Sequence, residues 1–186
     1  MKDDLQDSPL GAHETRVLHV DDEPEFGGLV QTYLEQLGEE IVVVSETDPE
    51  TGFERLSTDV VDCVVSDYQM PHMDGIEFLR LVREKYPNLP FILFTGKGSE
   101  EVATEAINAG VTKYLQKSGP ETFELLTKQV QNAVAKQRSE RLAQVTKDRL
   151  FSLYEHADGF YMLDTDWHIT YWNQRIAERT DRPPDE

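Results

Sequence analysis

The chain has 186 residues, of which 36 are acidic and 18 basic, giving a net charge of −18. A surface this negative repels phosphate, so we expect no nucleic-acid binding by this segment. The excess acid is typical of a well-solvated surface, as in a salt-adapted (halophilic) protein, or of one that selects a basic partner. With 38% hydrophobic residues, no apolar run near the ~20 residues of a membrane helix and no secretion signal, we expect a globular, cytoplasmic protein without membrane contact.

Five short apolar runs alternate with segments of helical periodicity. The runs predict strands at 17–20, 41–44, 60–65, 91–94 and 111–116. The intervening segments predict helices that begin near Pro24, Pro49, Asp74, Glu100 and Pro120, the last of which runs to about His156. Strands covered on both faces are continuously apolar, so the pattern predicts a doubly wound parallel α/β sheet.

Polar residues follow four of these runs: Asp21 and Asp22, then Asp67, Thr95 and Lys117. In such sheets ligands bind outside the carboxyl ends of the strands, where these residues converge. Three close carboxylates repel one another unless a hard cation such as Mg²⁺ joins them, and a hydroxyl with an ammonium can hold phosphoryl oxygens. Any one of the five could be a helix cap or a turn residue, but the set predicts an aspartyl-phosphate site.

The segments VLHVDDEPEF, CVVSDYQMPHMDG, FILFTGKG and YLQKSG carry a family likeness. They resemble the receiver domain of two-component response regulators, over about residues 15–120. The resemblance implies a flavodoxin-like, five-stranded parallel sheet of strand order 2-1-3-4-5. It also implies a phosphoacceptor that receives its phosphoryl group from a histidine kinase or a phosphotransfer protein.

The resemblance assigns the phosphoryl chemistry to named positions. Asp67 matches the phosphoacceptor. Asp21 and Asp22 match the acidic pair that binds Mg²⁺ together with Asp67, and the backbone carbonyl of Gln69 completes the expected protein ligands. Mg²⁺ is therefore the expected cofactor, whereas nothing in the sequence argues for haem or flavin.

Further positions match the switch and the residues that tune the lifetime of the phosphoryl group. Thr95 matches the switch hydroxyl, Lys117 the phosphate-binding lysine and Tyr114 the aromatic switch position. Gln69 and Lys97 lie two residues after Asp67 and Thr95, where they flank the expected path of attacking water. Lys97 is equally well explained as a solvated loop lysine.

One position departs from the family pattern. Receivers usually have proline directly after the lysine, commonly through a cis bond, whereas this chain has Ser118. A cis bond before serine costs roughly 2.5–4 kcal/mol, so both a trans loop and a strained cis loop are open at this point.

The pattern divides the chain into four parts. Residues 1–15 are expected to be a flexible arm, 16–120 the receiver and 121–148 a connector helix. The connector is either a solvated extension of the last receiver helix or a parallel coiled coil that makes a homodimer.

Residues 149–186 resemble the start of a PAS sensor domain, through the stretch DGFYMLDTDWHITYWN with expected hairpin strands at 160–163 and 169–172. So small a piece cannot bury a core alone, which indicates an incomplete domain.

Taken together, the sequence predicts the phosphoacceptor of a phosphorelay that passes its signal through the C-terminal helix to a PAS-containing output. A hybrid sensor or relay protein is favoured over a DNA-binding response regulator whose output domain is missing. No histidine-kinase core is visible in these residues, although a longer protein could carry one. An aspartyl-nucleophile phosphatase is disfavoured, because its Asp-x-Asp-x-Thr signature is not met: Asp164 and Asp166 are followed by His168.

Overall fold

The computed structural model describes residues 14–180. It divides into two compact units, Met1–Gln137 and Arg138–Glu186, which are described separately. Most of the expected flexible arm, 1–13, lies outside the described residues, and Thr15 already belongs to the first strand.

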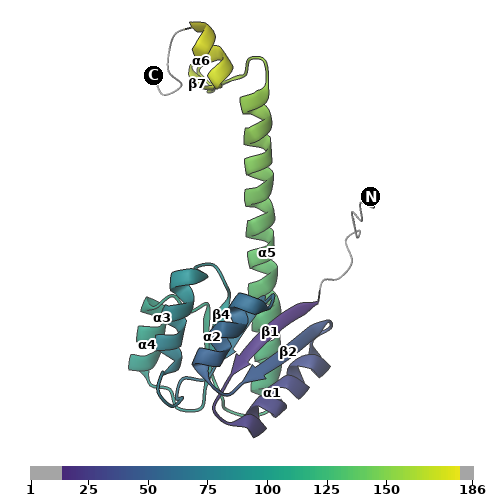
Figure 1. The fold of residues 1–186 in the computed structure, drawn as a ribbon, viewed down its shortest axis with the longest axis vertical. Helices are drawn as coiled ribbons and strands as arrows, with labels where there is room; N and C mark the ends of the chain where they lie inside the picture. Colours follow the sequence, from purple (N-terminus) through teal and green to yellow (C-terminus); the bar gives the residue numbers. More distant parts are fainter. Residues whose placement is uncertain (1–13, 181–186) are drawn as a thin grey trace. The chain divides into compact units, whose positions relative to one another are not determined.

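The first unit contains a five-stranded parallel sheet (Figure 1). Its strands are β1 (Thr15–Val20), β2 (Ile41–Glu46), β3 (Cys63–Ser66), β4 (Phe91–Thr95) and β5 (Lys113–Gln116). They pair in the order β2-β1-β3-β4-β5, and every pairing is parallel. The predicted flavodoxin-like fold and its strand order are therefore confirmed.

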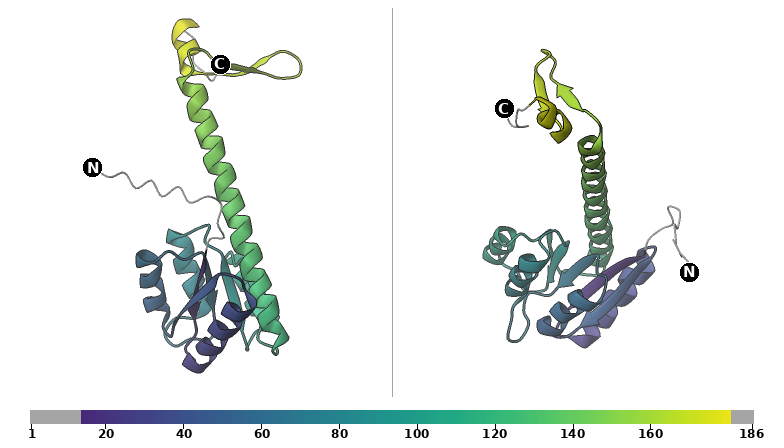
Figure 2. Two further views of the ribbon diagram at one scale, coloured as in Figure 1. Left: turned by 90° about the vertical axis from the view of Figure 1, so that its right-hand side faces the viewer. Right: turned by 45° about the horizontal axis from the view of Figure 1, so that its top comes forward.

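Helices cover both faces of the sheet, as the views in Figure 2 show. They are α1 (Pro24–Leu37), α2 (Pro49–Thr58), α3 (Gly75–Lys85), α4 (Glu100–Asn108) and α5 (Glu121–His156). Helix α1 and the first turns of α5 share one apolar core with the sheet, whereas α2, α3 and α4 share the core on its other face. The central strands β1, β3 and β4 are thus covered on both sides, which explains their continuous apolar runs, whereas the edge strands β2 and β5 are partly exposed.

Short polar side chains cap α2, α3 and α4, close to where the sequence predicts that these helices begin. Asp48 accepts a hydrogen bond from the N–H of Thr51 at the start of α2. Asp74 forms a capping box with Glu77 at the start of α3, and Ser99 caps α4. Each cap satisfies backbone donors that a helix leaves unpaired at its N-terminus. These caps fix where each helix leaves the carboxyl edge of the sheet.

Strand β3 begins later than the apolar run 60–65 predicts. Asp62 donates its N–H to the carbonyl of Arg16, and its carboxylate accepts the N–H of Arg16 at 3.0 Å. The N–H of Arg16 is thus bound by a side chain and not by the backbone of β3. Regular pairing between β1 and β3 therefore starts only at Cys63.

Strand β5 is also shorter than the run 111–116 predicts. The hydroxyl of Thr112 accepts the N–H of Phe91 at 3.0 Å, while the N–H of Thr112 donates to the carbonyl of Phe91. A side chain again takes the place of a backbone partner, and the strand starts at Lys113.

The second unit comprises the end of α5, the antiparallel hairpin β6 (Tyr161–Leu163) and β7 (Ile169–Trp172), and the helix α6 (Gln174–Thr180). The hairpin lies where the sequence predicts it. Asn173 is fully buried and joins the parts: its amide nitrogen donates to the carbonyls of Tyr154 and Ala157, and its amide oxygen accepts the N–H of Phe160. One side chain thus ties the helix end to the hairpin.

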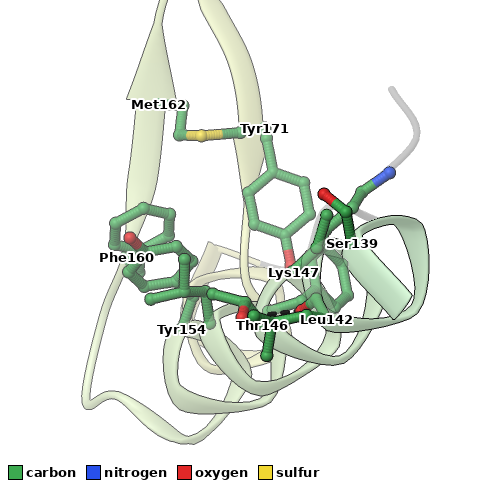
Figure 3. A pocket seen from close by; sticks show the side chains of 11 residues that line it. Ser139, Leu142, Thr146, Lys147, Tyr154, Phe160, Met162 and Tyr171 are labelled. Carbon is green, nitrogen blue, oxygen red and sulfur yellow. Dashed lines mark hydrogen bonds between the residues drawn. The ribbon is translucent and has the colours of Figure 1, made fainter. Parts of the chain in front are cut away.

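An apolar cavity of about 660 Å³ lies between the hairpin and the end of α5 within this unit. In Figure 3 the rings of Phe160 and Tyr171 point from the hairpin toward the helix, where Leu142 and Tyr154 lie. The rings of Tyr154 and Phe160 stack with their centroids 4.2 Å apart.

Within residues 14–180, no helix combines the length and apolar character needed to cross a bilayer.

Candidate functional site

A polar cavity of about 380 Å³ lies at the carboxyl edge of the first unit's sheet. Asp21 follows β1, Asp67 follows β3, Thr95 ends β4 and Lys117 follows β5. The cavity is lined by these four and by Asp22, Glu23, Phe26, Gln69, Gly96 and Lys97. The structure thus brings together the acids, the hydroxyl and the ammonium that the sequence predicts at one rim.

Lys117 bridges two of the acids. Its Nζ lies 2.7 Å from Oδ2 of Asp21 and 2.7 Å from Oδ1 of Asp67. The side chains of Asp21 and Asp67 are only 2% and 10% exposed, so water screens them poorly. Two buried carboxylates this close would repel each other, and the ammonium between them offsets that repulsion.

Backbone N–H groups hold the remaining oxygens of the two acids. Oδ1 of Asp21 accepts the N–H of Glu23 at 2.9 Å, and Oδ2 of Asp67 accepts the N–H of Gln69 at 2.7 Å. Each carboxylate therefore has one oxygen fixed by the backbone two residues on and one paired with Lys117. Charge-assisted bonds of this kind fix the orientation of both groups before any ligand arrives.

Thr95 and Lys97 also line this cavity. The hydroxyl of Thr95 is buried and accepts the N–H of Lys97 at 3.2 Å. The side chain of Lys97 is exposed. A hydroxyl and a movable ammonium therefore stand beside Asp67, within the same cavity.

Gly75 lets helix α3 begin directly against Asp67. A Cβ at Gly75 would lie too close to the carbonyl oxygen of Asp67, and the N–H of Gly75 donates to the carbonyl of Tyr68 at 2.8 Å. Only glycine allows this approach. The turn after β3 is thereby fixed, and with it the direction of the Asp67 side chain.

His19 is a buried part of the site that the sequence reasoning missed. Its Nε2 lies 3.9 Å from Oδ2 of Asp21, and its Nδ1 has no hydrogen-bond partner within residues 14–180. Burial, and then the charge of Lys117, lower the pKa of His19 to about 3. The imidazole is therefore neutral beside Asp21 and forms no ion pair with it. In the sequence, His19 is only a histidine within the apolar run 17–20, and this position alone does not indicate a place beside the site.

Tyr114 lies half-buried in the core on the α4 side of the sheet. Its hydroxyl is buried and has no hydrogen-bond partner in the described part of the chain, and it lies against Gly98 in the loop before α4. All described peptide bonds are trans, including the one between Lys117 and Ser118. Of the two conformations that the sequence left open for this loop, the structure therefore has the trans one.

The donor set fits a hard divalent cation. Carboxylate oxygens of Asp21, Asp22 and Asp67 line one cavity, which Lys117 neutralises only in part. Mg²⁺ prefers such oxygen ligands and keeps several waters, for which this open cavity has room. Within residues 14–180 no three acidic, histidine or cysteine side chains already form a metal cluster. Lys117 lies between Asp21 and Asp67 and occupies part of this space.

The strand order, together with acids, lysine and threonine at the carboxyl edge, defines a flavodoxin-like protein of the receiver class. Comparison with known families agrees: residues 17–131 match the response regulator receiver domain. The chain therefore belongs to the receiver domain family of two-component response regulators.

Individual relatives show the same likeness. The response regulator protein FleR of Pseudomonas aeruginosa is 35% identical over 102 residues, which are 55% of this chain and 21% of that protein. The chain spans about a fifth of the length of the first curated relatives that it matches. A receiver domain protein from Clostridium thermocellum superposes with a TM-score of 0.61 at 26% identity, covering 67% of this chain and 97% of that one. The beryllofluoride-activated NtrC4 receiver domain dimer gives 0.59 at 28% identity, covering 66% and 98%.

Proposed function

We propose that Asp67 accepts a phosphoryl group from the phosphohistidine of a histidine kinase or a phosphotransfer protein. A carboxylate oxygen of Asp67 attacks phosphorus, the bond between phosphorus and the imidazole nitrogen breaks, and the imidazole leaves with a proton from solvent. The observation that carries this proposal is the placement of Asp67 in the cavity, with one oxygen held by the N–H of Gln69 and the other by Lys117.

The other residues of the cavity stabilise the charge that the phosphoryl group brings. Lys117 needs to move little to pair with a phosphoryl oxygen, since it already contacts Asp67. Asp21, Asp22, Asp67 and the carbonyl of Gln69 would hold Mg²⁺, which would supply the charge neutralisation that carboxylates alone cannot.

Thr95 and Tyr114 form the proposed switch. The hydroxyl of Thr95 accepts the N–H of Lys97 and can turn toward phosphoryl oxygens. Its movement would carry the loop that contains Gly98, against which Tyr114 lies. A local hydrogen bond would thereby bias the position of the half-buried Tyr114 ring. Gln69 and Lys97 flank Asp67 and are proposed to tune how fast water removes the phosphoryl group.

Intact-mass measurement tests the assignment. The protein is treated with a small acyl phosphate and Mg²⁺, and one added phosphoryl group is expected. Asp67→Asn should remove it, whereas Asp148→Asn, on the exposed part of α5, should keep it. An added phosphoryl group on Asp67→Asn would overturn the assignment of the acceptor.

We further propose that α5 passes the signal to a PAS domain that begins near Arg149, as part of a hybrid sensor or relay protein. The hairpin and the buried Asn173 support an ordered start of such a domain. A DNA-binding output remains the alternative. Sequencing the full coding region decides between them.

A homodimer through α5 is proposed on the basis of its exposed apolar side chains. Leu142, Val145, Leu150, Phe151 and Leu153 are all exposed. The likeness to a receiver that forms a dimer gives further support. Sedimentation at increasing concentration tests it: the wild type should dimerise and Leu142→Glu should not. Gln144→Glu is the matched control for the added charge, and an unchanged dimer in Leu142→Glu would contradict the proposal.

A further inference from the structure

Phe26 lies directly beneath the ammonium of Lys117. The Nζ atom is 4.0 Å from the centroid of the Phe26 ring and lies over its face. The next ring, that of Phe94, is 5.8 Å away. Phe26 belongs to the first turn of α1, four residues after Asp22. The sequence pattern identifies it only as an apolar helix residue.

We propose that Phe26 is a positioning residue for the phosphoryl chemistry at Asp67: its ring face holds the ammonium of Lys117 between Asp21 and Asp67. This inference rests on the function proposed above. It assigns a role in the site to an apolar side chain that carries no proton and binds no metal.

The geometry around Nζ gives the physical reason. An ammonium has three N–H donors, and carboxylate oxygens of Asp21 and Asp67 occupy two directions at 2.7 Å each. The ring of Phe26 covers a further side, where its negative quadrupole attracts the cation and keeps water away. The Lys117 side chain is only 18% exposed, so this attraction is little weakened by solvent.

Without the ring, Lys117 would have other partners. Its stem is flexible, and the exposed carboxylates of Asp22 and Glu23 line the same cavity. A lysine paired with either would no longer stand beside the oxygen of Asp67 that it now contacts. A leucine at position 26 would fill the space and yet provide no aromatic face.

Phe26 also fills space in the core, and the experiment must separate that role from positioning. Its ring centroid lies 6.0 Å from those of Phe94 and Phe123. Phe123 is in the same aromatic cluster, whereas the Nζ atom of Lys117 lies over the rings of Phe26 and Phe94. Phe123→Leu is therefore the matched control for lost aromatic packing.

Two measurements on the full chain test the inference. Urea unfolding is measured for Phe26→Leu and Phe123→Leu, each with Lys117 and with Lys117→Met. The effect of Phe26→Leu on the unfolding equilibrium should be about two- to tenfold larger when Lys117 is present. The effect of Phe123→Leu should be the same in both backgrounds.

The second measurement is the rate of phosphorylation by a small acyl phosphate with Mg²⁺. Phe26→Leu should slow it by roughly fivefold, and Phe26→Tyr, which keeps the ring, should restore it to near the wild-type rate. Additive unfolding effects of Phe26→Leu and Lys117→Met, or a phosphorylation rate of Phe26→Leu equal to that of the wild type, would overturn the inference. A wild type that takes up no phosphoryl group would instead refute the proposed function, while the unfolding cycle still decides whether Phe26 holds Lys117.

Discussion

The hydroxyl of Tyr114 lies at the place that a side chain on Gly98 would occupy. The backbone of Gly98 is not in the left-handed region, so its own conformation would tolerate alanine. The requirement for glycine therefore comes mainly from Tyr114, while the amide nitrogen of Gln116 is a less severe neighbour at 3.3 Å from the added Cβ. Glycine at position 98 therefore leaves the space that the Tyr114 hydroxyl occupies, and a larger residue there would exclude the hydroxyl.

We expect Gly98→Ala to destabilise the protein by about 1–3 kcal/mol, because the added methyl group overpacks a buried contact. The cost should largely disappear when Tyr114→Leu has already removed the hydroxyl. Urea unfolding of the two single variants and the double variant measures this. An equal cost of Gly98→Ala in both backgrounds would show that the tyrosine is not the cause.

The stability of the fold should depend on pH through His19. Burial lowers its pKa to about 3 from an ordinary 6.5, so the unfolded chain binds the proton more readily. The contribution of neutral His19 to the free energy of unfolding is complete above pH 6.5. This contribution is lost progressively as the pH falls from 6.5 toward 3. The loss is at most about 1.4 kcal/mol per pH unit.

The matched variant for this effect is His19→Gln, which keeps a polar side chain but does not titrate. Its free energy of unfolding should vary less between about pH 6.5 and 5, where most carboxylates remain ionised. If wild type and variant have the same slope over that interval, His19 does not titrate as expected.

Mg²⁺ should stabilise the fold, because it would relieve repulsion among Asp21, Asp22 and Asp67. A ligand at a hundred times its Kd adds about 2.7 kcal/mol, which a thermal unfolding experiment resolves easily. The comparison is made at constant ionic strength, with Asp22→Asn as the variant in which the midpoint should shift less. A wild-type midpoint that does not respond to Mg²⁺ would argue against a shared metal site.

The second unit should depend on Asn173. Asn173→Ala would leave the part-buried carbonyls of Tyr154 and Ala157 and the N–H of Phe160 without their partner. A fully buried unsatisfied group costs roughly 1–3 kcal/mol, and the cost of each of these groups should lie below that because they are partly exposed. Amide hydrogen exchange should show faster exchange beyond residue 149 than in 16–118 in the wild type. It should show loss of the remaining protection in the hairpin of the variant, but not in Gln174→Ala. A hairpin equally protected in Asn173→Ala would contradict this.

Periodicity and strand-end chemistry predict much of this molecule. Continuous apolar runs indicate a sheet covered on both faces, and the residues that follow them lie at one rim because the strands are parallel. The run 60–65 misleads because the side chain of Asp62 pairs with the backbone of Arg16 before the strand begins. Apolar content alone carries no information about such a contact.

The interior of the site could not be predicted in the same way. Lys117 and Asp21 are 96 positions apart, and which oxygen the lysine approaches depends on how β5 and β1 are placed in the folded sheet. The contact between Lys117 and Phe26 depends on the same placement. Sequence spacing reveals which residues reach the rim, whereas the packing beneath them decides their pairing.

Cys63 provides a practical advantage for further work. It is the only cysteine, it is fully buried in β3, and burial raises the pKa of its thiol. The folded protein therefore presents no reactive native thiol. A single cysteine introduced at an exposed position such as Leu153 can be labelled selectively with a fluorophore or a spin probe, without first replacing the native residue.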